Sequence, residues 1–317
     1  MSAVPGIDAA EHRRGLWMAL GAFVIWGLMP LYWRLLDHVP SLEIVAQRVL
    51  WSALLVVAWL GWKHGRGWLR NTVPDARTAA LLTASGLLIG FNWGLYIWAV
   101  NAGHVVETAL GYFINPLLNV LIGVAFLRER LRPLQWLAVA IAAAGVLWLT
   151  VRHDGLPWIA LALAASFALY GLIRKLVAVP PVRGLGVESL VLLLPAVALL
   201  AWLHVGPGDR VPLSPGVDAS LRHGPATWLL LAFAGVLTAL PLIGFAYAVQ
   251  RVSLTVVGLM QYLAPTLQFL IGVLVFHEPF DRDRAIGFGV IWVALALFAA
   301  EGWWRGRAGR AATLSAP

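Results

Sequence analysis

The chain contains no cysteine among its 317 residues. This absence excludes disulfides and thiolate metal sites, and it leaves the redox state of the compartment undetermined. The eight histidines form no cluster with acidic residues at metal-ligand spacing, and no nucleophile lies beside a base, so neither a cofactor nor enzymatic activity is expected. A GxxxxGK[ST] motif is also missing, which excludes a nucleotide-driven pump built from this chain alone.

Charged residues are scarce as well. They make up 12% of the chain, whereas a soluble domain carries about 25%. Hydrophobic residues make up 61%, and the mean hydropathy is +0.81. This composition predicts an integral membrane protein. We therefore interpret the net charge of +8 as contact with anionic lipid headgroups and as a topology signal, and we expect no nucleic-acid partner.

The apolar residues are gathered in ten continuous runs, each close to the length of about 20 residues with which a helix crosses a bilayer. Continuous runs favour helices over the alternating strands of a barrel. The fold class predicted is all-α integral membrane, with ten transmembrane helices. The runs cover residues 16–36, 42–62, 79–100, 105–127, 134–151, 156–177, 185–205, 227–249, 254–276 and 285–304.

The distribution of lysine and arginine predicts the orientation. If the N-terminus is cytoplasmic, sixteen of the 23 basic residues fall in cytoplasmic segments, Arg174 and Lys175 among them, and six fall on the opposite side. Cytoplasmic loops of membrane proteins carry such an excess. Both termini are therefore expected in the cytoplasm.

The second half of the chain repeats the first at an offset of 149 residues. PLLNVLIGVAFLRE at 116–129 and PTLQFLIGVLVFHE at 265–278 share seven of fourteen residues. The offset carries the third span onto the eighth, five crossings later, so the two copies should have opposite orientations. Inverted repeats of this kind are typical of secondary transporters. The alternative is a structural or receptor-like membrane subunit, for which opposed halves are not needed.

Particular segments carry a more specific pattern. They are GFNWGLYIWAVN at 90–101, LGYFINPLLN at 110–119, LRERLRPLQWLAV at 127–139, YGLIRK at 170–175 and QYLAPT at 261–266. In these segments the chain resembles the RarD group of EamA-type permeases in the drug/metabolite transporter superfamily, over nearly all of residues 11–305. The resemblance implies a bacterial inner-membrane protein with two inverted five-helix EamA repeats. The family label, chloramphenicol-sensitive protein, names a phenotype and not a ligand.

The repeat and the spans together define the expected organisation. A cytoplasmic tail at 1–15 precedes the first EamA repeat at 16–152, and the second repeat at 156–304 precedes a cytoplasmic tail at 305–317. The function predicted is secondary-active transport of small organic metabolites or drugs, by alternating access to a central polar cavity. Proton coupling is a hypothesis motivated by the superfamily and by acidic residues within the spans.

Polar and aromatic residues inside the spans are the candidates for substrate binding, because a polar group in lipid is costly unless it faces protein or water. Tyr112, Asn115 and Asn119 share one helical face, and Gln261 and Gln268 are the repeat equivalents of Tyr112 and Asn119. Two stripes facing a common centre would line a cavity; alternatively, they form interhelical hydrogen bonds. The full candidate set is Arg48, Asn92, Trp93, Tyr96, Tyr112, Asn115, Asn119, Gln261, Tyr262 and Gln268.

Arg48 lies about a turn and a half into the second predicted span. One interpretation is a cation that faces the cavity and holds an anionic substrate or a carboxylate gate. The other is a side chain that extends to the outer headgroups or pairs with Glu43. The sequence does not separate the two.

Coupling and gating candidates are the acidic residues and prolines of the spans. Glu43, Glu107 and Glu188 are candidate coupling groups, although the position of Glu188 near the start of its span favours an interfacial partner of Arg183 or Arg174. Pro116 and Pro265 remove a backbone donor, and we expect each to bend or open its helix as a hinge.

Overall fold

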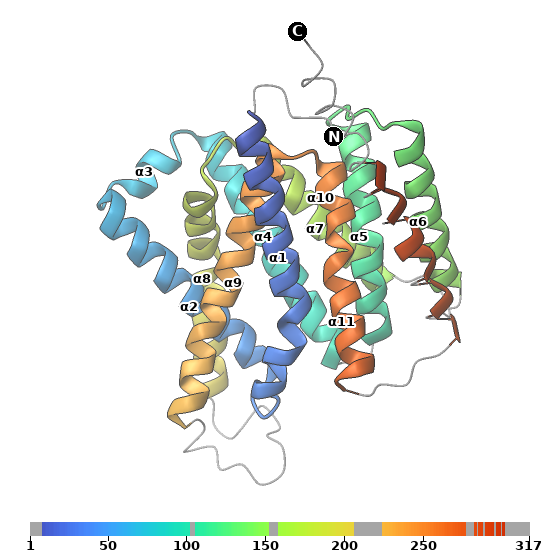
Figure 1. Ribbon diagram of the computed structural model, residues 1–317. Helices are drawn as coiled ribbons and strands as arrows, with labels where there is room; N and C mark the ends of the chain where they lie inside the picture. Colours follow the sequence, from blue (N-terminus) through green and yellow to red (C-terminus); the bar gives the residue numbers. More distant parts are fainter. Residues whose placement is uncertain are drawn as a thin grey trace.

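The computed structural model describes residues 8–101, 105–151, 158–205, 224–276 and 282–301, the last without residues 284, 288, 295 and 299. Over these ranges the chain is helical (Figure 1). The elements are α1 (Ala9–Trp33), η1 (Arg34–Leu36), α2 (Ser41–His64), α3 (Trp68–Thr72), α4 (Ala76–Asn101), α5 (Val105–Ala125), α6 (Pro133–Val151), α7 (Trp158–Leu176), α8 (Pro181–Val205), α9 (Pro225–Arg251), α10 (Leu254–Gln261) and α11 (Leu263–Leu274). Further helical residues lie between Arg282 and Glu301.

Seven helices in the described ranges are long and apolar enough to cross a membrane. They are α1, α2, α4, α6, α7, α8 and α9. Two shorter apolar helices cover Leu110–Ala125 and Ala285–Phe298. The all-helical membrane fold is thus confirmed, whereas the number of ten crossings stays a prediction.

Short polar side chains fix where several helices begin. Asp8 accepts a hydrogen bond from the Glu11 N–H at 2.6 Å and so caps α1. Asp75 accepts from the Thr78 N–H at 2.7 Å just before α4, and this hydrogen bond lowers the pKa of the Asp75 carboxyl. Ser253 caps α10 in the same way, through the Val256 N–H. These caps satisfy backbone donors that have no partner within the first turn of a helix.

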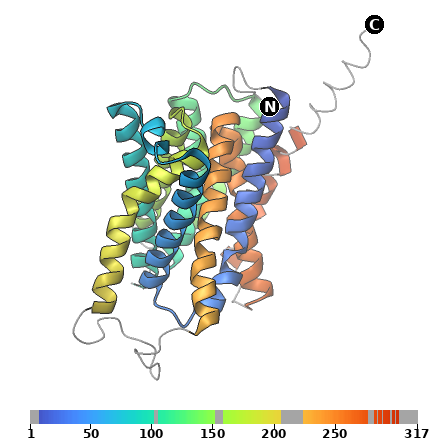
Figure 2. The same ribbon diagram turned by 90° about the vertical axis from the view of Figure 1, so that its left-hand side faces the viewer.

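The helix bounds reproduce the repeat of the sequence. Shifted by 149 residues, the bounds of α4 fall on 225–250 and those of α5 on 254–274, which match α9 and the α10–α11 pair. The packing repeats as well. The contact of α1 with α9 corresponds to that of α7 with α4, and the contact of α2 with α9 corresponds to that of α8 with α4. The halves, α1–α6 and α7 onward, are thus related by a pseudo-twofold arrangement (Figures 1 and 2).

The ninth predicted span, 254–276, is not one continuous helix. It is divided at Tyr262 into α10 and α11. Pro265 has no N–H to donate to the Gln261 carbonyl four residues earlier, so the helical ladder is interrupted there, as its proline predicts. Pro116, in contrast, lies inside the uninterrupted helix α5. There α10 packs directly on the proline turn, because a Cβ at Gly258 would lie only 2.9 Å from the Pro116 carbonyl oxygen.

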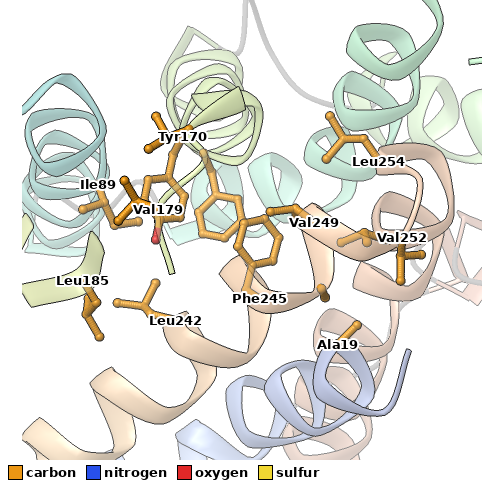
Figure 3. Close-up of a cluster of buried hydrophobic side chains, with 14 of the residues drawn as sticks. Ala19, Ile89, Tyr170, Val179, Leu185, Leu242, Phe245, Val249, Val252 and Leu254 are labelled. Carbon is orange, nitrogen blue, oxygen red and sulfur yellow. The ribbon is translucent and has the colours of Figure 1, made fainter. Parts of the chain in front are cut away.

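The largest buried apolar cluster lies where helices of the two halves meet. Figure 3 shows the rings of Tyr170 on α7 and Phe245 on α9 beside each other, and their centroids are 6.0 Å apart. Phe167 and Trp26 extend this group of rings toward α1. Aromatic rings bury large areas and prefer such offset or tilted contacts. The core therefore joins the halves instead of filling each one separately.

Many large apolar side chains point outward. Trp17 is 66% exposed, Leu194 78% and Leu229 71%. Such surfaces would be unfavourable in water, but they match the hydrocarbon of a bilayer. The spans are accordingly apolar on their outer faces as well as on the faces that pack in the core.

Candidate functional site

A small cavity lies between the two halves, where α2 and α4 face α8 and α9. Its volume is about 10 Å³, which leaves room for a single water at most. An organic substrate does not fit, so this conformation is closed around the centre. The walls are formed by Val49, Ser52, Ile89, Trp93, Leu185, Glu188, Ser189, Leu192, Thr238 and Leu242.

Arg48 lies against one wall of this cavity. Its Nε donates a hydrogen bond of 3.0 Å to the Thr238 hydroxyl on α9, which in turn donates to the Ala234 carbonyl. The guanidinium lies 4.5 Å from the centroid of the Trp93 ring and 5.6 Å from that of Trp33. Arg48 thus reaches toward the opposite half, where its contacts favour the interpretation of a cation that faces the protein interior.

Two tyrosines extend the surroundings of Arg48. The ring centroids of Tyr96 on α4 and Tyr112 on α5 are 5.9 Å apart, and both tyrosines lie near the Arg48 guanidinium. Four of the predicted residues, Arg48, Trp93, Tyr96 and Tyr112, are therefore brought together. We call Arg48 with Trp33, Trp93 and Thr238 the Arg48 site.

Glu188 forms part of the cavity wall on α8 and is 1% exposed. The Ser85 hydroxyl on α4 donates to its Oε1 at 2.5 Å, and Nη1 of Arg174 on α7 lies 3.5 Å from the same oxygen. Arg174 is also 1% exposed, and its Nη2 donates to the Pro181 carbonyl. The sequence allowed an Arg174–Glu188 pair at the membrane interface; the structure forms this pair with both side chains buried in the protein, and the position of the pair at the membrane interface stays a prediction.

The remaining amide side chains bridge helices. Asn119 on α5 donates to the Gln261 side chain on α10 at 2.7 Å, which joins the two stripes of the repeat. Asn92 on α4 donates to the Leu163 carbonyl and the Ser166 hydroxyl on α7. Gln268 on α11 donates to the Trp26 carbonyl on α1. These hydrogen bonds fit the interhelical alternative that the sequence left open.

Other candidates lie apart from the cavity wall. Tyr262 is fully buried and stacks on Phe113. Asn115 is buried on α5, and Glu43 is buried near the start of α2. The side chain of Glu107 lies outside the described residues.

A carboxylate joins the halves at the end of the bundle where α1 begins, which we call the amino end. Glu129, four residues after α5, accepts hydrogen bonds from the N–H groups of Leu254 and Thr255 and from the Thr255 hydroxyl, at 2.7–3.0 Å. Nζ of Lys175 on α7 lies 4.0 Å from Glu129 and donates to the carbonyls of Val249 and Val252. A carboxylate at a helix N-terminus is favoured by the helix dipole. We call this contact the Glu129 latch.

Sequence reasoning missed several residues of the site. Ser52, Ser85 and Thr238 carry small hydroxyls that are common in membrane helices as backbone-bonded groups, so nothing in the sequence marks them. Trp33 lies within the predicted span 16–36 but was not among the candidates. Arg174 was assigned to a cytoplasmic segment because it stands beside Lys175 at a helix end, although the fold buries it.

The fold and the site define an integral membrane protein with two equivalent helical halves around a polar centre. The EamA-like transporter family matches residues 13–151 and 156–300. The chain belongs to this family and is a permease of the RarD type.

Individual relatives agree with this membership. An uncharacterized transporter of Pseudomonas aeruginosa is 44% identical, over 93% of this chain and 96% of the relative. Protein RarD of Escherichia coli is 40% identical, over 92% and 96% of the two chains. The chloramphenicol-sensitive protein RarD of Pseudomonas aeruginosa is 36% identical, over 92% and 94%. The fold is also similar to that of a solved crystal structure, with a TM-score of 0.66 at 21% identity, over 89% of this chain and 96% of the other.

Proposed function

We propose that the protein is a secondary-active transporter of small organic molecules that works by alternating access. The observation that carries this proposal is the position of the cavity, with Glu188 in its wall, between two halves with equivalent packing. Halves related in this way can exchange conformations, which opens the centre first to one side and then to the other. The proposal includes ten inverted spans, a bacterial inner membrane and cytoplasmic termini, as the distribution of basic residues predicts.

Proton exchange is the coupling that we propose, with Glu188 as the carrier. A carboxylate that faces the cavity and is bonded to Ser85 and Arg174 can exchange a proton when the cavity is hydrated. Arg174 would stabilise its ionised form, and release of Arg174 would favour proton uptake. Intramembrane acidic groups in transporters serve such relays.

The absence of cysteine allows a direct test of alternating access. Ser52→Cys and Ser189→Cys each place a single thiol at the cavity wall. In proteoliposomes of known orientation, we expect a membrane-impermeant maleimide to label each thiol from either side, because both sides reach the centre in turn. The measurement is the labelling rate from each side.

His64→Cys, at the exposed end of α2, is the control and should react from one side only. Access to both cavity thiols from the same single side under all conditions would contradict the proposal.

The Glu129 latch is proposed to hold the amino end closed. Glu129→Gln removes the charge that attracts the α10 N-terminus and Lys175, and losing a charge-assisted contact costs about 1 kcal/mol, or about fivefold in an equilibrium. We therefore expect Ser189→Cys to be labelled about fivefold faster from the amino end in this background. Glu11→Gln removes a half-exposed partner of Arg251 at the same end and should leave the rate unchanged. Equal rates in both backgrounds would exclude Glu129 as a latch.

A further inference from the structure

Within the part of the chain that the structure describes, the positive charge of the Arg48 site has no carboxylate beside it. Among the described residues, no carboxylate oxygen lies within 4.0 Å of Arg48, which contacts the Thr238 hydroxyl and two aromatic rings. Other cations of the bundle differ. Arg174 lies beside Glu188, Lys175 beside Glu129 and Arg132 beside Glu301. A cation inside a membrane span is costly and is ordinarily compensated by a partner.

The geometry also leaves the hydrogen-bonding edge of the guanidinium free. The Thr238 hydroxyl accepts a hydrogen bond from Nε alone, and the rings of Trp33 and Trp93 lie beside the guanidinium. Nη1 and Nη2 donate to none of the described residues, so the pair of N–H groups that matches a carboxylate stays open. Rings packed around an arginine fix its orientation and also provide flat apolar surfaces for a ligand.

We propose that the substrate is an organic anion with a flat, aromatic body. Its carboxylate would be held by Nη1 and Nη2 of Arg48, and its ring would lie among Trp93, Tyr96 and Tyr112. This inference rests on the proposed transport function and names the substrate class of the same site. Since the closed cavity admits one water, the anion enters when the halves separate and widen the space beside Trp93.

The proposal explains why Arg48 and Thr238 come from different halves. Arg48 lies on α2 in the first half and Thr238 on α9 in the second. A negative group bound at Nη1 and Nη2 leaves the Nε contact with Thr238 in place, so the anion is held at the interface of the two halves. Anion binding is linked to movement of one half relative to the other when one conformation binds the anion more tightly than the other.

The test uses the full-length protein in proteoliposomes and three aromatic carboxylates as probes: benzoate, 1-naphthoate and indole-3-carboxylate. Their neutral amides are the matched comparison ligands, and cyclohexanecarboxylate is the non-aromatic anion. We expect at least one carboxylate to bind about tenfold more tightly than its amide, because a bidentate charge-assisted contact is lost in the amide. Arg48→Gln should abolish this preference, and Arg48→Lys should retain part of it. Trp93→Leu should reduce the preference for the aromatic over the cyclohexane carboxylate about tenfold.

The outcomes separate this inference from the transport function. Equal binding of a carboxylate and its amide, unchanged carboxylate affinity in folded Arg48→Gln protein, or no carboxylate binding up to about 10 mM would overturn the anion proposal. In each of these cases, two-sided labelling of Ser52→Cys and Ser189→Cys would still support alternating access, whereas one-sided labelling would remove the transport function itself.

Discussion

Arg174→Met is expected to destabilise the protein more than any other single substitution considered. The substitution leaves Glu188 buried, at 1% exposure, without its cation. Removing one partner of a buried ion pair costs about 3–5 kcal/mol, because the remaining charge has neither water nor a counter-charge. We expect a strong loss of folded protein, measured as the thermal unfolding midpoint and as the monodisperse fraction after extraction in detergent.

Two further variants make this expectation specific. The double variant Arg174→Met with Glu188→Leu removes both charges and should recover most of the lost stability, since apolar replacements of buried pairs are often neutral. Arg251→Met breaks the more exposed pair with Glu11 and should cost about 1 kcal/mol or less. A double variant as unstable as Arg174→Met would show that Arg174 acts through its packing and not through its charge.

Gly235→Ala is expected to have the second largest effect. A Cβ at Gly235 on α9 would lie 2.6 Å from the Trp51 Cβ and 2.7 Å from the Ser52 backbone nitrogen on α2. Backbone cannot move aside as a flexible side chain can, so α2 and α9 must separate. Overpacking of this kind costs about 1–3 kcal/mol, and here it also displaces Ser52 from the cavity wall. The measurement is the thermal midpoint of the purified protein.

The repeat supplies the control for Gly235. Gly86 is its equivalent on α4, but a Cβ there would lie 3.3 Å from the nearest atom, the Glu188 Cα. Gly86→Ala should therefore be milder than Gly235→Ala, and Gly21→Ala, with nothing within 4 Å, should be neutral. Equal effects at all three positions would show that helix propensity, and not close packing, determines the response.

Much of the architecture follows from the sequence. The runs at 79–100 and 227–249 lie within three residues of the observed bounds of α4 and α9, because lipid requires a continuous apolar helix and the charged breaks mark its ends. The offset of 149 residues correctly paired α5 with the α10–α11 segment. The proline rule predicted that Pro116 and Pro265 each bend or open a helix; the helix is divided near Pro265, whereas a hinge at Pro116, inside the continuous helix α5, stays a prediction.

The candidate site was predicted only in part. The structure does bring together Arg48, Trp93, Tyr96 and Tyr112. Exposing a cation or a polar ring to lipid is unfavourable, so these side chains turn toward the protein interior. Thr238, their neighbour from the other half, could not be foreseen. In a membrane helix the lipid-facing side is as apolar as the core, so periodicity does not show which face meets another helix.

The sequence by itself determined that this protein lies in a lipid bilayer, that its two halves are repeats, and where its helices approximately begin and end. These properties depend on local hydrophobicity and on similarity between distant segments. Only the tertiary structure decided which charges are partnered. It placed Arg174 beside Glu188 in the protein interior and left Arg48 beside aromatic rings, because ion pairing depends on the distances between packed helices, and close contacts at residues such as Gly235 set these distances.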